Sequence, residues 1–437
     1  MSELRTLRVA LLGAGSVGSQ VARLLIEDAA ELSARAGISI DLVGVAVRSL
    51  DAARDFDIPA ALLTTDAHEL VRRADVVIEL IGGIEPARTL ILEAIASGAD
   101  VVTGNKALIA AHGAELFAAA ARVGALISYE AAVAGAIPII RPLRESLAGD
   151  RIERILAIVN GSTNFILDRM DRFGDTMEQA QKTAFELGFL EADPTLDVGG
   201  YDAAQKAAIL ARLAFHGEVP ADSVYREGIE DITAEQIAAA AKAGCTIKLL
   251  AITERVSGAA GEGISTRVYP ALIPREHPLA SVHGGNNAVF VEAAAAGPLM
   301  FYGAGAGGVQ TASAVLGDLV SAARRHVDGG PGQAVNAAAA LPLLPFGEIS
   351  TKYQISLTVI DRPGVLARIA GILAEGGVSV ETVEQSVPEE GENGEAVAVL
   401  VIGTHTSREA AVQDTVASLR SSDAVKSVVS VLRFEGA

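Results

Sequence analysis

Short apolar runs alternate with helical patterns over the first third of the chain. The runs lie at residues 7–12, 40–47, 75–83 and 99–104, and segments with apolar residues at helical spacing lie between them at 17–26, 66–73 and 86–97. Apolar runs of this length, separated by helical segments, are typical of strands buried on both faces of a parallel sheet. The pattern therefore predicts an α/β domain with helices on the faces of its sheet.

The pattern changes after residue 140. Ala-rich helical segments and two predicted strands, at 263–274 and 287–302, indicate an α+β domain with a mixed sheet over residues 141–327, whose last helix we expect to pack back on the first domain. Residues 328–350 are rich in Gly, Pro and Ala, as linkers are. Residues 351–437 follow the order βαββαβ, which predicts a ferredoxin-like module.

A glycine motif follows the first apolar run directly. Gly13, Gly15 and Gly18 form GxGxxG between the predicted strand and the helical pattern that begins at Val17. Such glycines permit a tight turn and a close approach of the backbone, including Ser16, to a pyrophosphate at the helix N-terminus. A glycine-rich turn without a ligand is the alternative. The context predicts that residues 1–140 form a Rossmann-type dinucleotide-binding domain.

The second strand ends in Arg48, where NAD-binding domains carry an acidic residue for the ribose hydroxyl. A guanidinium suits a 2′-phosphate, so Arg48 favours NADP over NAD, although NAD stays open because an arginine at a strand end can also face solvent.

Two later strand ends carry further candidates. Gly82 lies at the end of the third strand, and Thr103 lies at the end of the fourth, shortly before Lys106. Ligands of open α/β sheets bind beyond these carboxyl ends. A lysine at a helix N-terminus opposes the helix dipole, which favours a role toward substrate for Lys106, whereas a solvent-facing lysine is the alternative.

Residues 186–206 carry too much charge and too many turn residues for a buried helix. Asp202 and Lys206 stand four residues apart on a new helix, so the carboxylate can orient the ammonium. Glu191 and Asp197 lie in the loop before it. This arrangement suits a small substrate with an ammonium group and a carbonyl, while an ordinary surface ion pair is the alternative.

This segment resembles the signature of the homoserine dehydrogenase family. The matching positions are Ala184, Gly188, Phe189, Asp193, Pro194, Asp197, Val198, Gly200, Asp202 and Lys206. The resemblance implies interconversion of aspartate 4-semialdehyde and homoserine, with Glu191 and Asp197 on the substrate ammonium and Lys106 and Lys206 on the carbonyl oxygen. It does not say which lysine supplies the proton.

The same resemblance implies further site residues. Thr163, in the segment NGSTN at 160–164, would contact substrate, and Gly303 begins a second glycine loop beside cofactor and substrate. A monovalent cation, Na⁺ or K⁺, would be held by the carboxylate of Glu130 and the carbonyls of Val133, Gly135 and Ile137. Oxygen ligands suit such a cation, but backbone amides that satisfy a buried Glu130 are an equal alternative.

The turn Asp361-Arg-Pro-Gly364 in the terminal module resembles the ACT family of amino-acid-sensing domains. That resemblance implies an amino-acid effector, and we expect threonine, the end product to which homoserine leads. A homodimer or homotetramer is expected, with the outer face of the middle domain's sheet as a contact.

Bulk composition limits the partners. The 437 residues are 50% hydrophobic with a formal net charge of −19, which opposes binding to nucleic acid or anionic lipid. The single cysteine, Cys245, excludes an internal disulfide, and no apolar run would span a bilayer, so we expect a cytoplasmic enzyme. A dehydrogenase of another small amino acid, or a non-catalytic amino-acid sensor, are the alternative functions.

Overall fold

The first domain is built on a six-stranded sheet in the order β3-β2-β1-β4-β5-β6, with all neighbouring strands parallel. The computed structural model describes residues 6–190, 193–258, 261–329, 341–386, 389–390 and 396–436. The elements are β1 (Thr6–Leu12), α1 (Ser16–Glu27), α2 (Ala29–Ala36), β2 (Ser39–Ala46), β3 (Leu63–Thr64), α3 (Ala67–Arg72), β4 (Val76–Glu79), α4 (Ala87–Ala96), β5 (Asp100–Thr103), α5 (Lys106–Val123) and β6 (Ile127–Ser128). The parallel α/β prediction is confirmed.

Local capping explains where α5 begins and ends. The Asn105 side chain accepts from the backbone N–H of Leu108 at 3.1 Å, and Gly124 ends the helix in the left-handed conformation with φ 74°. The cap places Lys106 in the first turn, at the carboxyl edge of the sheet.

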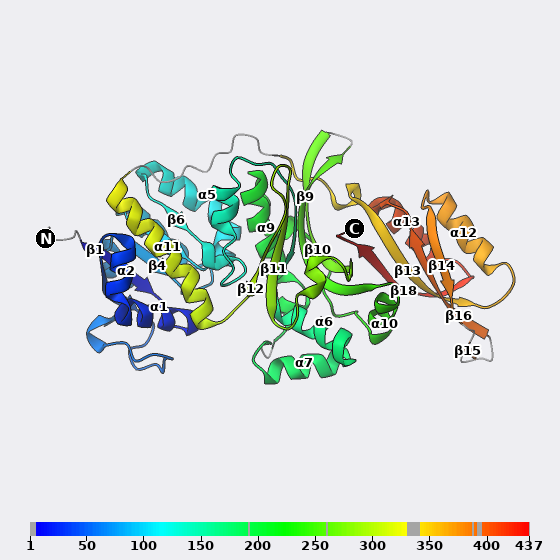
Figure 1. Cartoon of the computed structure of the whole chain (residues 1–437), viewed down its shortest axis with the longest axis horizontal. Coiled ribbons are helices and arrows are strands. Elements are labelled where there is room, and N and C mark those ends of the chain that lie inside the picture. The colour runs from blue at the N-terminus through cyan, green and yellow to red at the C-terminus, as the bar shows by residue number, and fades with distance from the viewer. Residues whose placement is uncertain are drawn as a thin grey trace.

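The long helix α11 (Gly308–Asp328) returns to this first domain. Its buried Ala312, Val315 and Leu319 belong to the same apolar core as β1 and α1, and Figure 1 shows α11 lying across α1. The chain therefore contributes to the first domain twice, through residues of its N-terminal part and through α11.

The middle domain contributes β7 (Ile152–Ile158), α6 (Gly161–Phe173), α7 (Met177–Glu186), α8 (Thr195–Val198), α9 (Tyr201–Phe215), β8 (Tyr225–Arg226), α10 (Ala234–Lys242), β9 (Cys245–Gly258), β10 (Gly261–Pro274), β11 (Asn286–Ala293) and β12 (Gly297–Ala304). The predicted strand at 263–274 is confirmed within β10. Two details differ from the expectation. The segment 287–302 is a hairpin, because Gly297 at φ 73° turns the chain, and β9 is a long strand that the sequence analysis did not identify.

The terminal module has the predicted order βαββαβ, with two additional two-residue strands, β15 and β17. Its elements are β13 (Ser350–Ile360), α12 (Val365–Glu375), β14 (Val380–Gln385), β15 (Glu389–Glu390), β16 (Ala396–Thr404), β17 (Ser407–Arg408), α13 (Glu409–Arg420) and β18 (Val425–Phe434). Its sheet joins the middle domain's sheet to form one 12-stranded mixed sheet. Nine strands follow the path β12-β11-β7-β9-β10-β18-β13-β16-β14, and β8, β17 and β15 pair beside β10, β13 and β16. Figure 1 shows this continuity on the right of the molecule.

Within the described residues, no helix combines the length and apolar character needed to cross a membrane.

Candidate active site

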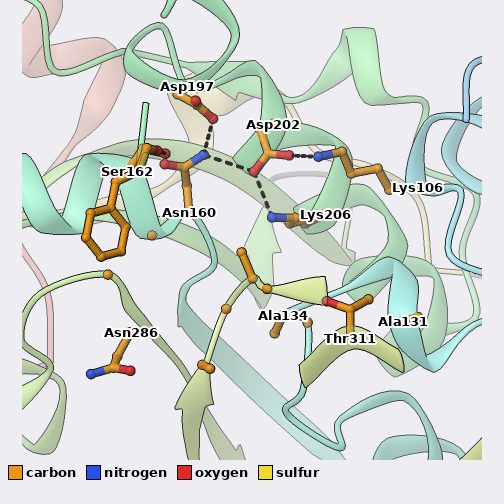
Figure 2. A pocket seen from close by; sticks show the side chains of 18 of the residues that line it. Lys106, Ala131, Ala134, Asn160, Ser162, Asp197, Asp202, Lys206, Asn286 and Thr311 are labelled. Carbon is orange, nitrogen blue, oxygen red and sulfur yellow. Dashed lines mark hydrogen bonds and ion pairs between the residues drawn. The ribbon is translucent and has the colours of Figure 1, made fainter. Parts of the chain in front are cut away.

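A cleft of about 710 Å³ opens between the first and middle domains. Its walls come from α5, the end of β7, the segment before α9, and the loops at 285–286 and 304–307. The lining includes Val17, Gly104, Lys106, Ala134, Asn160, Ser162, Phe189, Asp197, Asp202, Lys206, Asn286 and Thr311. Figure 2 shows the charged groups gathered on one side of this cleft.

The carboxylate of Asp202 lies between two lysines. Its Oδ1 accepts from the ammonium of Lys106, and its Oδ2 accepts from that of Lys206 at 2.7 Å (Figure 2). Lys206 also donates to the carbonyl of Val159 at 2.6 Å. An ammonium has three N–H donors, so Lys206 retains one for a ligand in the cleft.

Burial and neighbouring charges set the protonation of Asp202 and Lys206. Burial alone would raise the pKa of Asp202, but the ammonium groups of Lys206 and Lys106 outweigh it and hold that pKa well below its usual range. Burial lowers the pKa of Lys206, the nearby Lys106 adds to this effect, and Asp202 opposes it. Lys206 is thus a stronger acid than an exposed lysine.

Asn160 joins this group to Asp197. Its Nδ2 donates to Asp197 Oδ1 at 2.6 Å and to Asp202 Oδ2 at 3.0 Å, while its Oδ1 caps α6 by accepting from the N–H of Thr163 at 2.9 Å. One amide therefore fixes two carboxylates and a helix start. The sequence analysis included Asn160 only as the first residue of the segment NGSTN, because nothing in the sequence relates position 160 to the distant positions 197 and 202.

Two residues that were predicted to contact substrate do not line the cleft. Thr163 is buried, its hydroxyl donates to Asn160, and it is absent from the cleft lining, where Ser162 is found instead. Gly303 lies in β12, while Ala304, Gly305, Ala306 and Gly307 form the wall. Glu191 lies outside the described residues. Substrate contact by these three residues stays a prediction.

The first glycine loop has the geometry of a phosphate cradle. A Cβ on Gly18 would lie 2.1 Å from the carbonyl oxygen of Gly13, so only glycine permits the turn, whereas a Cβ on Gly15 would meet nothing within 4 Å. Gly15 precedes α1 without any side-chain cap, which leaves the first N–H groups of the helix, from Ser16 and Val17, for an anion. These residues fit a dinucleotide.

The remaining cofactor candidates border the same edge. Arg48 is exposed just beyond β2, and Gly82 has φ 79° just beyond β4. Thr103 is buried, and its hydroxyl donates to Glu79 Oε2 at 2.7 Å, so this side chain holds two strand ends together.

Glu130, in the 3₁₀ turn Glu130–Ala132, is saturated by donors. Its carboxylate accepts from the N–H groups of Ile139, Ile140 and Arg141 at 2.5, 2.7 and 3.0 Å, and from Arg141 Nε at 3.2 Å. This arrangement matches the amide alternative, and the carboxylate as it stands does not fit a cation. A site made with Val133, Gly135 and Ile137 stays a prediction.

Comparison with known proteins identifies the chain. The homoserine dehydrogenase NAD-binding family model matches residues 13–130, the homoserine dehydrogenase family model matches residues 138–320, and the ACT domain model matches residues 353–417. A homoserine dehydrogenase of Corynebacterium glutamicum is 50% identical over 98% of this chain and 95% of its own length. A homoserine dehydrogenase of Mycobacterium leprae is also 50% identical, over 100% of this chain and 99% of its own length.

The chain belongs to the homoserine dehydrogenase family.

Solved structures agree with this membership. A homoserine dehydrogenase from Thiobacillus denitrificans has a TM-score of 0.90 at 40% identity and covers 100% of this chain and 99% of its own. A hyperthermophilic archaeal homoserine dehydrogenase in complex with NADPH has a TM-score of 0.60 at 28% identity, over 75% of this chain and 99% of its own. Homoserine dehydrogenases are NAD(P)-dependent oxidoreductases that interconvert L-aspartate 4-semialdehyde and L-homoserine, and the predicted function is confirmed.

Proposed function

We propose that Lys206 exchanges the proton of the substrate oxygen in the homoserine dehydrogenase reaction, with Lys106 polarising that oxygen. The observation that carries this proposal is the placement of both ammonium groups on one buried carboxylate, Asp202, at the wall of the cleft. Lys206 is the better proton carrier because burial lowers its pKa, whereas the Lys106 side chain is 41% exposed.

The substrate ammonium needs a negative partner on the same side of the cleft. Asp197, on the short helix α8, has its Oδ1 bonded to Asn160 and lines the cleft, so it supplies one carboxylate for that ammonium. Glu191 would supply a second. When bound, the nicotinamide cofactor supplies or accepts the hydride, while the protein positions the substrate and moves its proton.

Replacing Lys206 by Ala tests the proton role. We expect turnover to fall by roughly 10²- to 10⁴-fold, the usual contribution of a positioned acid or base. The dissociation constant for the cofactor should change little, because Lys206 belongs to the substrate side of the cleft and is not part of the glycine loop. Turnover near the wild-type value at saturating homoserine would contradict the assignment.

The pH profile tests it independently. In homoserine oxidation, unprotonated Lys206 accepts the hydroxyl proton, so kcat/KM should rise with pH and level off below pH ~10.4, where an exposed lysine titrates. Asp202 raises the pKa of Lys206, so Asp202→Asn should move this rise to lower pH. A rise at unchanged pH in Asp202→Asn would exclude Lys206 as the titrating group.

We also propose that NADP is preferred over NAD, on the basis of Arg48 beyond β2. Arg48→Glu places a carboxylate that repels a 2′-phosphate and can accept from a ribose hydroxyl. The ratio of kcat/KM values for the two cofactors should move toward NAD by about tenfold, or ~1.4 kcal/mol. The neighbouring Arg54 is a control, because it bonds the carbonyl of Ala52 at 2.9 Å and that of Leu50 at 3.1 Å. An equal shift in Arg54→Glu would point to a general charge effect.

We propose threonine as the effector of the ACT module. A hollow of about 350 Å³ borders the turn from Val359 to Leu366, where Gly364 at φ 93° precedes α12 without a side-chain cap. Uncapped N–H groups at a helix start suit an amino-acid carboxylate.

Gly364→Asp should abolish inhibition of the full-length enzyme by millimolar threonine, because it places a carboxylate at that helix start. Gly377→Asp is a matched control, since Gly377 has φ 71° just after the other end of α12. Inhibition that survives in Gly364→Asp, or a wild-type enzyme that ignores threonine, would overturn the effector assignment.

A homodimer or homotetramer is also part of the proposal. The support is the edge strand β12, in which no residue is buried and Tyr302 is 55% exposed. A bound Na⁺ or K⁺ would depend on backbone carbonyls, because amides already occupy Glu130, and no step of the proposed reaction needs it.

A further inference from the structure

The terminal module is attached to the catalytic half by more than a linker. Strand β18 pairs in parallel with β10 through Ala271 with Arg433 and Leu272 with Phe434. This pairing places the last strand of the chain within the shared sheet, between β10 and β13 (Figure 1). The side chains at this junction can therefore act on both modules.

Arg433 bridges the two modules with two ion pairs, one to the buried Glu409 and one to Glu227, whose side chain is 36% exposed. Its guanidinium donates to Glu409, at the start of α13, at 2.8 and 2.7 Å, and contacts both carboxylate oxygens of Glu227 at 2.9 Å. Only 4% of Arg433 is exposed. A buried guanidinium cannot lose its charge, so Arg433 needs carboxylate partners to offset the cost of its burial.

Arg226, the residue before Glu227, contacts residues 198–201, which we call the substrate segment. The guanidinium carbon of Arg226 lies 3.4 Å from the centroid of the Tyr201 ring, and its NH1 donates to the carbonyl of Gly199. The N–H of Ile229 donates to the carbonyl of Val198 at 2.8 Å. Residues 226–229 thus hold residues 198–201, immediately before Asp202.

The start of α9 has little support of its own. Gly200 occupies its N-cap at φ 77° and offers no side chain to cap the helix. A Cβ on Gly228 would lie 2.4 Å from the carbonyl oxygen of Val198, so the two segments are as close as their backbones permit. Asp202 and Lys206 lie in the first two turns of this helix.

We propose that Arg226 is a positioning residue for the dehydrogenase reaction, and that Arg433 of the ACT module holds it in place through Glu227. The last strand of the module is thereby part of the support of Asp202 and Lys206. This inference rests on the proposed roles of those two residues.

Arg226→Met in the full-length enzyme is the first test. The substitution approximately keeps the length of the side chain but removes the guanidinium, and with it the hydrogen bond to Gly199 and the cation–π contact with Tyr201. We expect kcat/KM for homoserine to fall roughly tenfold to 100-fold, because displacement of reacting groups by ~1 Å has effects of that size. The KM for the cofactor should stay near its wild-type value, and Arg226→Lys should be intermediate, since an ammonium lacks the planar fork.

Arg275→Met is the matched control. Arg275 forms a single ion pair, 2.8 Å from Asp171, on the surface of the same domain. It should leave kcat/KM unchanged, so an equal loss there would overturn the positioning role.

Glu227→Gln tests the link to the ACT module, because Arg433→Met is liable to unfold the protein. Glu227→Gln should lower kcat/KM, as Arg226→Met does. It should also shift the pH at which kcat/KM rises, since the orientation of Asp202 affects the pKa of Lys206. Arg368→Met, which breaks only the exposed pair with Asp423 in the ACT module, should do neither.

The outcomes separate the two proposals. Wild-type kcat/KM and pH profile in both Arg226→Met and Glu227→Gln, with Lys206→Ala inactive, would overturn the positioning inference and leave the proposed function standing. An active Lys206→Ala would overturn the proposed function itself.

Discussion

The buried carboxylate of Asp202 is the interaction on which the catalytic half depends. It takes one ammonium on each oxygen, Lys106 from the first domain and Lys206 from its own helix. The two ammonium groups share this one carboxylate, so a carbonyl oxygen or alkoxide in the cleft would meet cationic N–H donors. Removing one partner of such a buried pair costs roughly 3–5 kcal/mol in known cases. The same contact therefore ties the first domain to α9 and contributes to the electrostatic environment for the reaction.

Buried charge also sets the attachment of the terminal module. Arg267 is almost fully buried in β10, 2.7 Å from Glu254 and 3.3 Å from Glu435, which follows β18. Together with the ion pairs of Arg433, the pair between Arg267 and Glu435 makes the C-terminal strand part of a network of ion pairs within the shared sheet. Buried ions tolerate few alternative partners, so the register of β18 on β10 is specified by charge as well as by backbone pairing. A chain that ended before β13 would leave Arg267 without Glu435.

Local patterns were enough for much of this structure. Strand, glycine loop and helix near Gly13, the i,i+4 pair Asp202 and Lys206, and the βαββαβ order of the last module are all features of neighbouring residues, and each was predicted. Contacts between residues far apart in the sequence could not be predicted from such local patterns. Lys106 meets Asp202 from 96 positions away. Strand β9 was missed because Lys248 interrupts its apolar run. The structure shows that this lysine is buried and that its Nζ donates to Asn164 and Val282. Burial lowers the pKa of Lys248 to about 8.

The segment that carried most of the functional signal is also the one least able to hold its own shape. Between Asp193 and Asp202 the chain has a single short helix, α8, then two adjacent glycines and an uncapped helix start. Such a stretch loses conformational entropy on folding without burying much apolar surface of its own. Its order must therefore come from outside, from Asn160 on one side and from residues 226–229 on the other. Strand β8 pairs with β10, and β10 pairs with β18 of the ACT module, so this outside support comes from a part of the sheet that contains the buried Arg267 and Arg433.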